Sequence, residues 1–299
     1  GKLWMIYGSY SGGIFVKEMD AESGMPLESG YGEKLLGGNH LRIEAPYVIC
    51  NEETGYYYMF LSFGGLDSDG GYNIRVCRSE NPNGPYVDSM GQDMKDCKGP
   101  AGSAFSDATA EQYGTKLMGG YKFTWKEGEE GEDRKGYLSP GHNSCLYQEE
   151  TGKYFIIYHT RFENSGETHE VRVHQMFFNE EGWPVIAPYR YTEESAEKLE
   201  SKQLVGTYKY INHGRDISPD MKESEELVLN KNNTISGALE GTWELSGDYN
   251  ITIKTDEAEY KGIALKQWDE DGKKYVMTFT ALDSKSGVVI WGSGLNAID

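Results

Sequence analysis

The sequence Gly55-Tyr-Tyr-Tyr-Met-Phe-Leu-Ser-Phe-Gly64 returns in recognisable form at two other places. One copy is Gly1-Lys-Leu-Trp-Met-Ile-Tyr-Gly-Ser-Tyr10, and the other is Gly152-Lys-Tyr-Phe-Ile-Ile-Tyr-His-Thr-Arg161. The copies are separated by one and then about two periods of roughly 50 residues, a spacing typical of β-propellers. The skipped copy is expected around Lys116–Phe123.

The sequence on either side of two copies is also similar. Upstream, Val48–Gly55 parallels Cys145–Gly152, each an apolar run that ends in a Glu-Glu-Thr-Gly turn. Downstream, Tyr72–Ser79 and His169–Met176 alternate apolar and polar residues, the pattern of a half-buried strand. Each repeat is therefore predicted to be a meander of short antiparallel strands, which is one propeller blade.

Aligning the repeats brings two polar residues into register. Glu44 and His142 fall within one residue of each other, at the start of the first strand of their blades. Because the first strand of each blade lines the central channel, a carboxylate and an imidazole are predicted to converge there. For each residue alone, a structural role remains open: Glu44 could form a salt bridge with Arg42, and His142 could be a core histidine.

The pattern changes after the charged stretch Thr192–Ser201, which reads as a linker or short helix. Beyond it, short alternating runs are separated by Asn, Gly and Asp turns. We predict a partial propeller over residues 1–198 and a small β-barrel or β-sandwich over residues 203–299. Within the second domain, His213–Asp216 is the one short polar cluster with a possible reach to the channel, and we expect it to serve packing.

Composition narrows the class of partner. The chain has 29 Lys and Arg against 48 Asp and Glu, a formal charge of -19, so nucleic acid would be repelled. The 22 tyrosines and six tryptophans suit a protein that stacks sugar rings on aromatic side chains. The sequence has no apolar run long enough for a membrane span, and its four cysteines lack metal or disulfide spacing, so we expect free or buried thiols.

Six motifs follow one another across residues 1–190 in the order found in glycoside hydrolase family 43. The chain most resembles the endo-acting α-1,5-L-arabinanases of that family that carry an extra C-terminal β domain. The matching stretches are Tyr7–Gly13, Arg42–Tyr47, Leu61–Gly65 with Gly70–Arg75, Tyr113–Gly119, Gly141–Ser144 and Tyr158–Phe162.

The resemblance implies an all-β fold with a five-bladed propeller, an inverting hydrolysis of α-1,5-linked arabinan, and a central calcium. It makes Glu44 the general acid and places Ser9 and Arg161 on the substrate side. It also implies that His142 approaches the calcium mainly through ordered water. Ala45 stands where these enzymes usually have glycine, which would stiffen the backbone beside the acid.

The reaction requires more carboxylates than this sequence supplies. Inversion needs an acid and an opposed base about 6.5 to 9.5 Å apart, with a water between them. The apolar neighbours of Glu44 would favour a protonated acid. The resemblance places the base aspartate and a second, pKa-modulating aspartate before Gly1. We therefore expect the N-terminal portion of the propeller to be missing from this chain and to be supplied by an N-terminal fragment of the same protein as a companion chain.

Two other functions stay open. The chain could be a noncatalytic carbohydrate-binding propeller, or an exo-acting arabinofuranosidase or xylosidase of the same fold. The family resemblance further implies a bacterial protein that is secreted, periplasmic or held at the cell surface.

Overall fold

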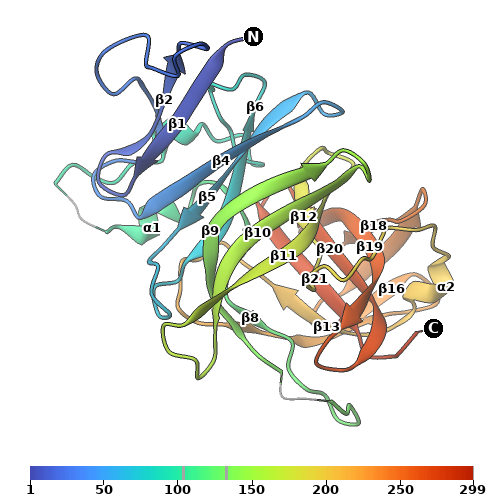
Figure 1. The fold of residues 1–299 in the computed structure, drawn as a ribbon. Helices are drawn as coiled ribbons and strands as arrows, with labels where there is room; N and C mark the ends of the chain where they lie inside the picture. Colours follow the sequence, from blue (N-terminus) through green and yellow to red (C-terminus); the bar gives the residue numbers. More distant parts are fainter. Residues whose placement is uncertain (103–104, 132–133, 299) are drawn as a thin grey trace.

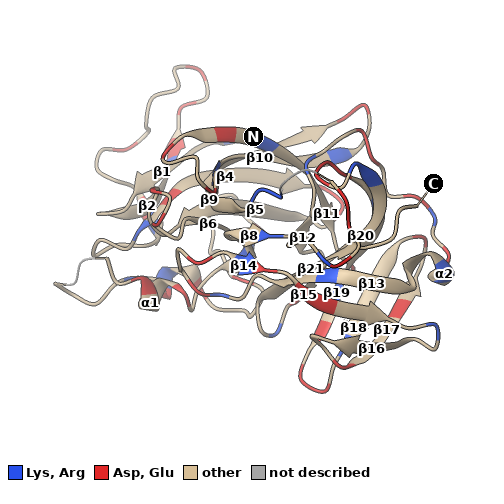
Figure 2. Ribbon diagram, turned by 90° about the horizontal axis from the view of Figure 1, so that it is seen from below, with Lys and Arg blue, Asp and Glu red and all other residues tan. Residues whose placement is uncertain are grey.

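The computed structural model describes residues 1–102, 105–131 and 134–298. The fold is all-β and consists of three open sheets followed by a closed barrel (Figure 1). In the described part of the chain, no helix has the length and apolar character needed to cross a membrane. Residues of both charge signs lie on many of the loops and strand ends (Figure 2).

The first two sheets are antiparallel meanders. The first contains β1 (Leu3–Ser9), β2 (Gly13–Met19) and β3 (Glu33–Leu36) in that order. The second contains β4 (Ile43–Asn51), β5 (Tyr56–Phe63), β6 (Asn73–Ser79) and β7 (Thr115–Met118). A long excursion between β6 and β7 carries the 3-10 helix η1 (Met94–Asp96) and the short helix α1 (Asp107–Ala110).

The third sheet has the order β12-β11-β10-β9-β8-β14. Its meander is formed by β9 (Tyr137–Gln148), β10 (Lys153–Phe162), β11 (His169–Phe178) and β12 (Pro184–Ile186). Two short strands extend it beyond β9, namely β8 (Tyr121–Lys122) and β14 (Lys222–Glu223). Since β14 belongs to the C-terminal part of the sequence, the second domain contributes a strand to this sheet.

The predicted blade around Lys116–Phe123 is wrong. Residues Thr115–Met118 form β7, which pairs with β6 and completes the second sheet, whereas β8 pairs with β9 of the third. Between these strands the chain crosses from one sheet to the next at Gly119 and Gly120. The double spacing between the second and third repeats comes from the excursion over residues 80–114, which a period count cannot distinguish from an extra blade.

The C-terminal domain is a closed antiparallel barrel, so of the two folds predicted for residues 203–299 the barrel is the one observed. It begins after the four-residue helix α2 (Ser201–Leu204). Its strands are β13 (Gly206–Asn212), β15 (Glu225–Leu229), β16 (Thr234–Gly237), β17 (Gly241–Ser246), β18 (Asn250–Lys254), β19 (Glu259–Asp269), β20 (Lys274–Asp283) and β21 (Val288–Gly294). Pairing of β13 with β21 closes the barrel. Buried side chains such as Trp243 and Phe279 belong to its own core.

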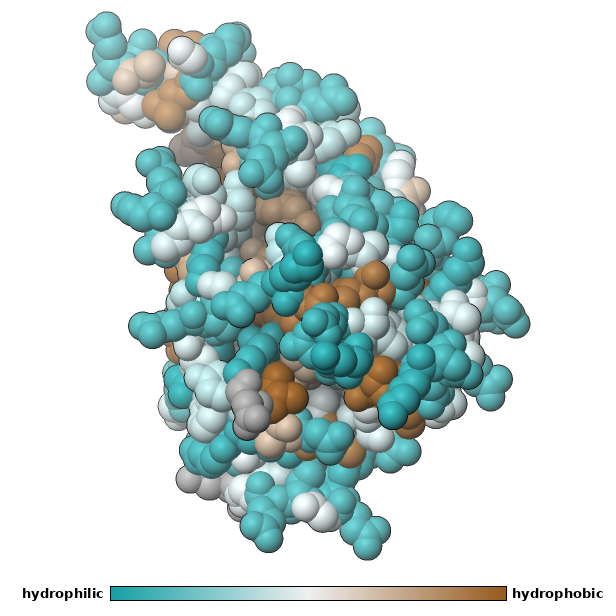
Figure 3. All heavy atoms as spheres, turned by 90° about the vertical axis from the view of Figure 1, so that its right-hand side faces the viewer, coloured by the Kyte–Doolittle hydropathy of each residue, from teal (hydrophilic) through white to brown (hydrophobic). Residues whose placement is uncertain are grey.

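The barrel and the sheets share a second core. Tyr58, Phe60 and Ile156 from the sheets lie in one buried cluster with Leu265 and Trp291 from the barrel. Burial of this much aromatic and aliphatic surface favours a fixed domain arrangement over a flexible tether. The barrel side of the molecule is mainly hydrophilic, with hydrophobic patches interrupted by polar side chains (Figure 3).

Candidate active site

Three strands from different sheets converge at the predicted site. The edge strand β4 of the second sheet lies against β1 of the first sheet and against β9 of the third (Figure 1). Glu44 is near the start of β4, Ser9 is the last residue of β1, and His142 lies in β9. The structure therefore places these three predicted residues on strands that lie next to one another.

Glu44 occupies an irregular position in its strand. It pairs with Ser62 of β5, and the register shifts between Glu44 and Tyr47. The next residue, Ala45, has a φ of 54°, a left-handed conformation that glycine adopts more easily. Such a bulge redirects side chains at a strand end, and it accounts for the preference for glycine beside the acid.

Two hydroxyl groups hold the half-buried carboxylate of Glu44. The Tyr72 hydroxyl donates to Oε1 at 2.7 Å, and the Ser9 hydroxyl donates to Oε2 at 3.2 Å. The alternative salt bridge with Arg42 is absent, because Arg42 forms its ion pair with Asp107 of α1 instead. The Glu44 carboxyl thus has neutral donors at both oxygens in the described structure.

Tyr72 is the site residue that sequence reasoning missed, although it lies within the motif Gly70–Arg75. Its side chain is fully buried. Burial raises the pKa of Tyr72 well above its usual value, and the Glu44 carboxylate raises it further. The phenol therefore stays protonated and acts as a hydrogen-bond donor. The signal available in the sequence was a tyrosine directly after paired glycines, which alone does not specify a partner.

His142 is linked to Glu44 through two neighbours. Its backbone N–H donates to the Ser62 hydroxyl at 2.7 Å, and Ser62 pairs with Glu44 across the sheet. The preceding Gly141 lies against the ring of Tyr72, where an added Cβ would come within 2.2 Å of two ring carbons. Glycine at this position permits the third sheet to approach the Tyr72–Glu44 pair closely.

A row of aromatic rings continues from Tyr72. His159 stacks on Tyr72 with 6.0 Å between ring centroids, and His142 stacks on His159 at the same separation. Burial, together with the nearby His169 and Arg161, lowers the pKa of His159 to about 4. His159 is therefore neutral near pH 7, and its Nδ1 has no hydrogen-bond partner within the described residues.

Arg161 lies on β10 and is almost completely buried. Its Nε is 2.7 Å from Oε2 of Glu167, which in turn accepts hydrogen bonds from Ser68. Nη1 of Arg161 has no partner among the described residues. The guanidinium is thus anchored at one edge and keeps a donor available.

The surroundings of His142 offer little direct ligation for a metal. Within the described residues, no group of three or more His, Cys, Asp or Glu side chains is arranged to hold an ion. The next residue, Asn143, is buried, and neither its amide oxygen nor its nitrogen has a hydrogen-bond partner in the described structure. Calcium prefers six to eight oxygen ligands, so these groups fit an ion held mainly through water and not a protein cage.

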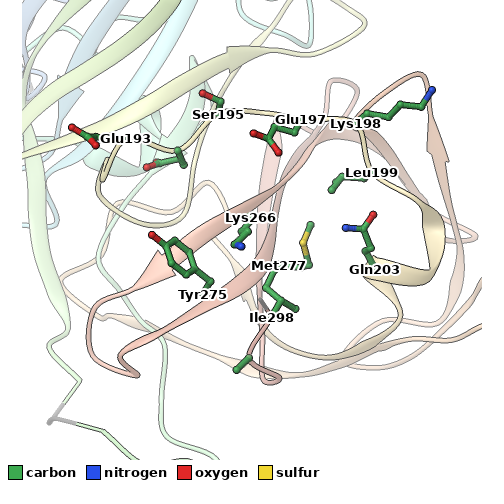
Figure 4. Close-up of a pocket in the computed structure, with 12 residues that line it drawn as sticks. Glu193, Ser195, Glu197, Lys198, Leu199, Gln203, Lys266, Tyr275, Met277 and Ile298 are labelled. Carbon is green, nitrogen blue, oxygen red and sulfur yellow. The ribbon is translucent and has the colours of Figure 1, made fainter.

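The large cavity of about 810 Å³ lies elsewhere, between the linker before α2 and the barrel strands β19 and β20 (Figure 4). Its lining includes Glu193, Glu197, Lys266 and Tyr275. Ser9, Glu44, His142 and Arg161 do not line it. All four cysteines are free thiols, with Cys50 the exposed one.

Comparison with known proteins points to one family. Residues 188–292 match the model of the C-terminal lipocalin-like domain of glycoside hydrolase family 43. Over 294 residues, 98% of this chain, it is 54% identical to the extracellular endo-α-(1→5)-L-arabinanase 2 of Bacillus subtilis. It is 49% identical over 298 residues to the extracellular endo-α-(1→5)-L-arabinanase of Thermotoga petrophila. Over almost its whole length the chain is therefore similar to members of glycoside hydrolase family 43, and residues 188–292 match the C-terminal domain of that family.

Solved structures agree with this assignment. A family 43 glycoside hydrolase from Bacillus licheniformis superimposes with a TM-score of 0.94 and 52% identity, over 99% of this chain and 65% of that one. The endo-1,5-α-L-arabinanase of Thermotoga petrophila gives a TM-score of 0.92 and 48% identity over the same shares. The chain spans 62% and 61% of the length of the two curated relatives named above.

Proposed function

We propose that this chain forms part of an extracellular bacterial endo-α-1,5-L-arabinanase, with Glu44 as general acid. The observation that carries the proposal is the placement of Glu44, whose carboxylate lies where three sheets meet and is oriented by Tyr72 and Ser9. The family relationship supplies the substrate class, since two relatives that share about half of its residues are named endo-arabinanases.

The chemistry follows from this geometry. The protonated Glu44 would donate to the oxygen of the leaving arabinosyl unit, while a base on the opposite face removes a proton from the attacking water. Donor contacts from Tyr72 and Ser9 would then stabilise the carboxylate that remains after proton transfer. Arg161, with an unpartnered Nη1, is proposed to contact substrate hydroxyl groups.

The base aspartate is proposed to lie outside these 299 residues. The three open sheets would be blades of a five-bladed propeller, and the remaining strands would come from an N-terminal segment, on the same polypeptide or on a companion chain. Support comes from the length of the curated relatives, of which this chain spans about three fifths. The test is to measure arabinan hydrolysis by three samples: residues 1–299 alone, the same chain with the N-terminal segment added in trans, and one continuous polypeptide. The three rates show whether the segment is required and whether it must be part of the same polypeptide.

Calcium is proposed to bind near His142 and to be held mainly through water. The proposal is supported by the exposed imidazole and by the adjacent Asn143 amide, whose oxygen and nitrogen have no hydrogen-bond partner among the described residues. When bound, the ion would supply a fixed positive charge close to the site. Within the chain, the Ser62 hydroxyl accepts a hydrogen bond from the His142 backbone, and Gly141 packs against the Tyr72 ring.

The decisive experiment is product analysis on debranched arabinan. An endo-acting enzyme releases a range of oligosaccharides early in the reaction, whereas an exo-acting enzyme releases one short product. Proton NMR during the first turnovers reports whether the anomeric configuration is inverted. Binding of arabino-oligosaccharide without any release of reducing ends would instead identify a noncatalytic propeller.

A further inference from the structure

A segment of the C-terminal domain packs against the hairpin of β5 and β6, whose connecting loop carries Tyr72. Residues 213–218 follow β13 and lead toward β14. The backbone N–H of Ile217 donates to Glu111 at 2.8 Å, and the Lys116 ammonium donates to the backbone carbonyl of Asp216 at 2.8 Å. The polar cluster that we expected to serve packing therefore contacts the sheet that carries the site.

The segment also accepts a hydrogen bond from a buried cation, Arg75 of β6. Arg75 is fully buried, and burial lowers its pKa to about 10, which leaves it charged near neutral pH. It donates to the backbone carbonyls of Glu111 and Tyr113 at 3.0 and 2.8 Å. Its Nη2 donates to the backbone carbonyl of Arg215, which lies in the segment. Because an unpaired buried guanidinium group is costly, Arg75 ties the segment firmly to β6.

Glycines make the packing between segment and hairpin very close. A Cβ added to Gly71 would lie 2.9 to 3.0 Å from backbone atoms of Ser218, and one added to Gly64 would lie 3.0 Å from a methyl carbon of Ile217. Gly71 directly precedes Tyr72. With no side chain between the two backbones, a shift of residues 217–218 would displace the backbone beside Tyr72.

Asp216 secures the segment from the other side. Its Oδ1 is 3.4 Å from the Lys116 ammonium, and its Oδ2 accepts from Lys222 at 2.8 Å. Burial alone would raise the pKa of Asp216, but Lys116 and Lys222 hold it below its usual value. Burial also lowers the pKa of Lys116 to about 8. The carboxylate thus compensates a largely buried ammonium group on β7 and a second one next to β8.

We propose that Asp216 is a positioning residue, through which the barrel domain sets the hydrogen bond between Tyr72 and Glu44. This inference rests on the proposed function, in which Glu44 donates a proton. The path has three short steps: Asp216 fixes residues 215–218, these fix Gly71, and Gly71 fixes Tyr72. Small displacements at a catalytic group have large kinetic effects, because proton transfer depends steeply on geometry.

The test uses the complete enzyme with Asp216→Ala, the gentler Asp216→Asn, and Asp216→Glu as the conservative variant. Asp248→Ala is the matched control, since Asp248, between β17 and β18 of the barrel, forms an exposed ion pair with Lys198 of the linker. We expect Asp216→Ala to lower kcat about tenfold while KM changes less than about twofold, because transition-state alignment is lost and ground-state binding is kept. Asp216→Glu should recover part of kcat.

A second readout does not depend on activity. Hydrogen–deuterium exchange of peptides covering residues 64–75 should accelerate in Asp216→Ala and Asp216→Asn, while peptides from β10 and β11 keep their rates. Unchanged exchange over residues 64–75 would overturn the proposal, as would a kcat within about twofold of the parent enzyme. If the parent enzyme hydrolyses no arabinan, the proposed function fails, and the exchange data still decide whether Asp216 positions the hairpin.

Discussion

The Tyr72 hydroxyl donates to Oε1 of Glu44 at 2.7 Å, and this bond joins β4 to the residue that directly precedes β6, where Gly141 of β9 lies against the Tyr72 ring. Tyr72 is fully buried, and its ring lies on Gly141 of β9. The orientation of the proposed acid therefore depends on a residue that makes no covalent or acid–base contribution of its own.

Replacing Glu44 by glutamine should abolish proton donation. Glutamine preserves shape and can still accept a hydrogen bond from Tyr72, but it has no acidic proton. We expect hydrolysis of unactivated arabinan to fall at least about 10²-fold, with oligosaccharide affinity nearly unchanged. Initial rates and calorimetric titration measure the two quantities. Glu149→Gln, at an exposed turn, is the control, and a Glu44→Gln enzyme within about tenfold of the parent would contradict the role.

Tyr72→Phe should separate orientation from acidity. The variant keeps the ring on Gly141 and removes the hydrogen bond to Glu44. Since a hydrogen bond to a charged group contributes about 1.5–3 kcal/mol, we expect kcat to fall roughly 10- to 100-fold. Tyr86→Phe is a matched control, because Tyr86 is almost as fully buried and its hydroxyl donates at 2.8 Å to the Pro82 carbonyl and not to Glu44. Equal kinetic losses in the two variants would show a general packing effect.

Much of this arrangement could be predicted from the sequence. The repeats predicted β5 and β10 and the strands before and after them. The alternation of apolar and polar residues and the Glu-Glu-Thr-Gly turns are short-range features, so they can be recognised without knowledge of the tertiary structure. The register of Glu44 and His142 followed from the same repeats. The extra blade at Lys116–Phe123 was wrong because pairing of β7 with β6 across a long excursion is a tertiary choice that local pattern does not encode.

The contacts of individual side chains were not predictable. Arg42 was considered as a partner of Glu44, yet its partner Asp107 comes from a helix 65 positions later in the sequence. Tyr72 stood in a quoted motif without any indication of its partner. The Tyr72 contact depends on how closely two backbones approach, and Gly141 permits that approach.

Substitutions at Ala45 should report the left-handed conformation beside the acid. Its φ of 54° is open to glycine and strained for a β-branched residue. We expect Ala45→Gly to change the free energy of unfolding by less than about 1 kcal/mol, and Ala45→Val to lower it by about 1–3 kcal/mol. Urea denaturation measures both values. An Ala45→Val protein as stable as the parent would show that the conformation relaxes at little cost.

Calcium dependence should be visible without an activity assay. If an ion binds near His142, adding calcium to chelator-treated protein should raise the midpoint of thermal unfolding, because the ion binds only the folded state. His142→Ala should reduce that shift, while His40→Ala, which changes an exposed histidine on another loop, should not. Elemental analysis gives the stoichiometry, and active protein that contains no divalent ion would rule the proposal out.

Stability should decline as pH falls from neutral toward 4, and His174 should contribute to the change. His174 is completely buried, with Nε2 2.9 Å from the Tyr158 hydroxyl and Nδ1 2.8 Å from the Ala187 carbonyl. The carbonyl can only accept, so Nδ1 donates to it and Nε2 accepts from Tyr158. Burial lowers the pKa of His174 to about 4. The unfolded chain, with an ordinary pKa near 6.5, therefore binds the proton more readily than the folded protein.

The sign and size of this effect follow from proton linkage. Because the folded pKa is the lower one, the stabilising contribution is complete above about pH 6.5 and is lost progressively as pH falls toward 4, up to about 3 kcal/mol. Urea denaturation at pH 7 and pH 5 measures the slope. His174→Gln should be less stable at pH 7 but should show a shallower decline between the two values. His40→Gln, which changes an exposed histidine on another loop, should retain the parental slope; if His174→Gln retains it too, the titrating group lies elsewhere.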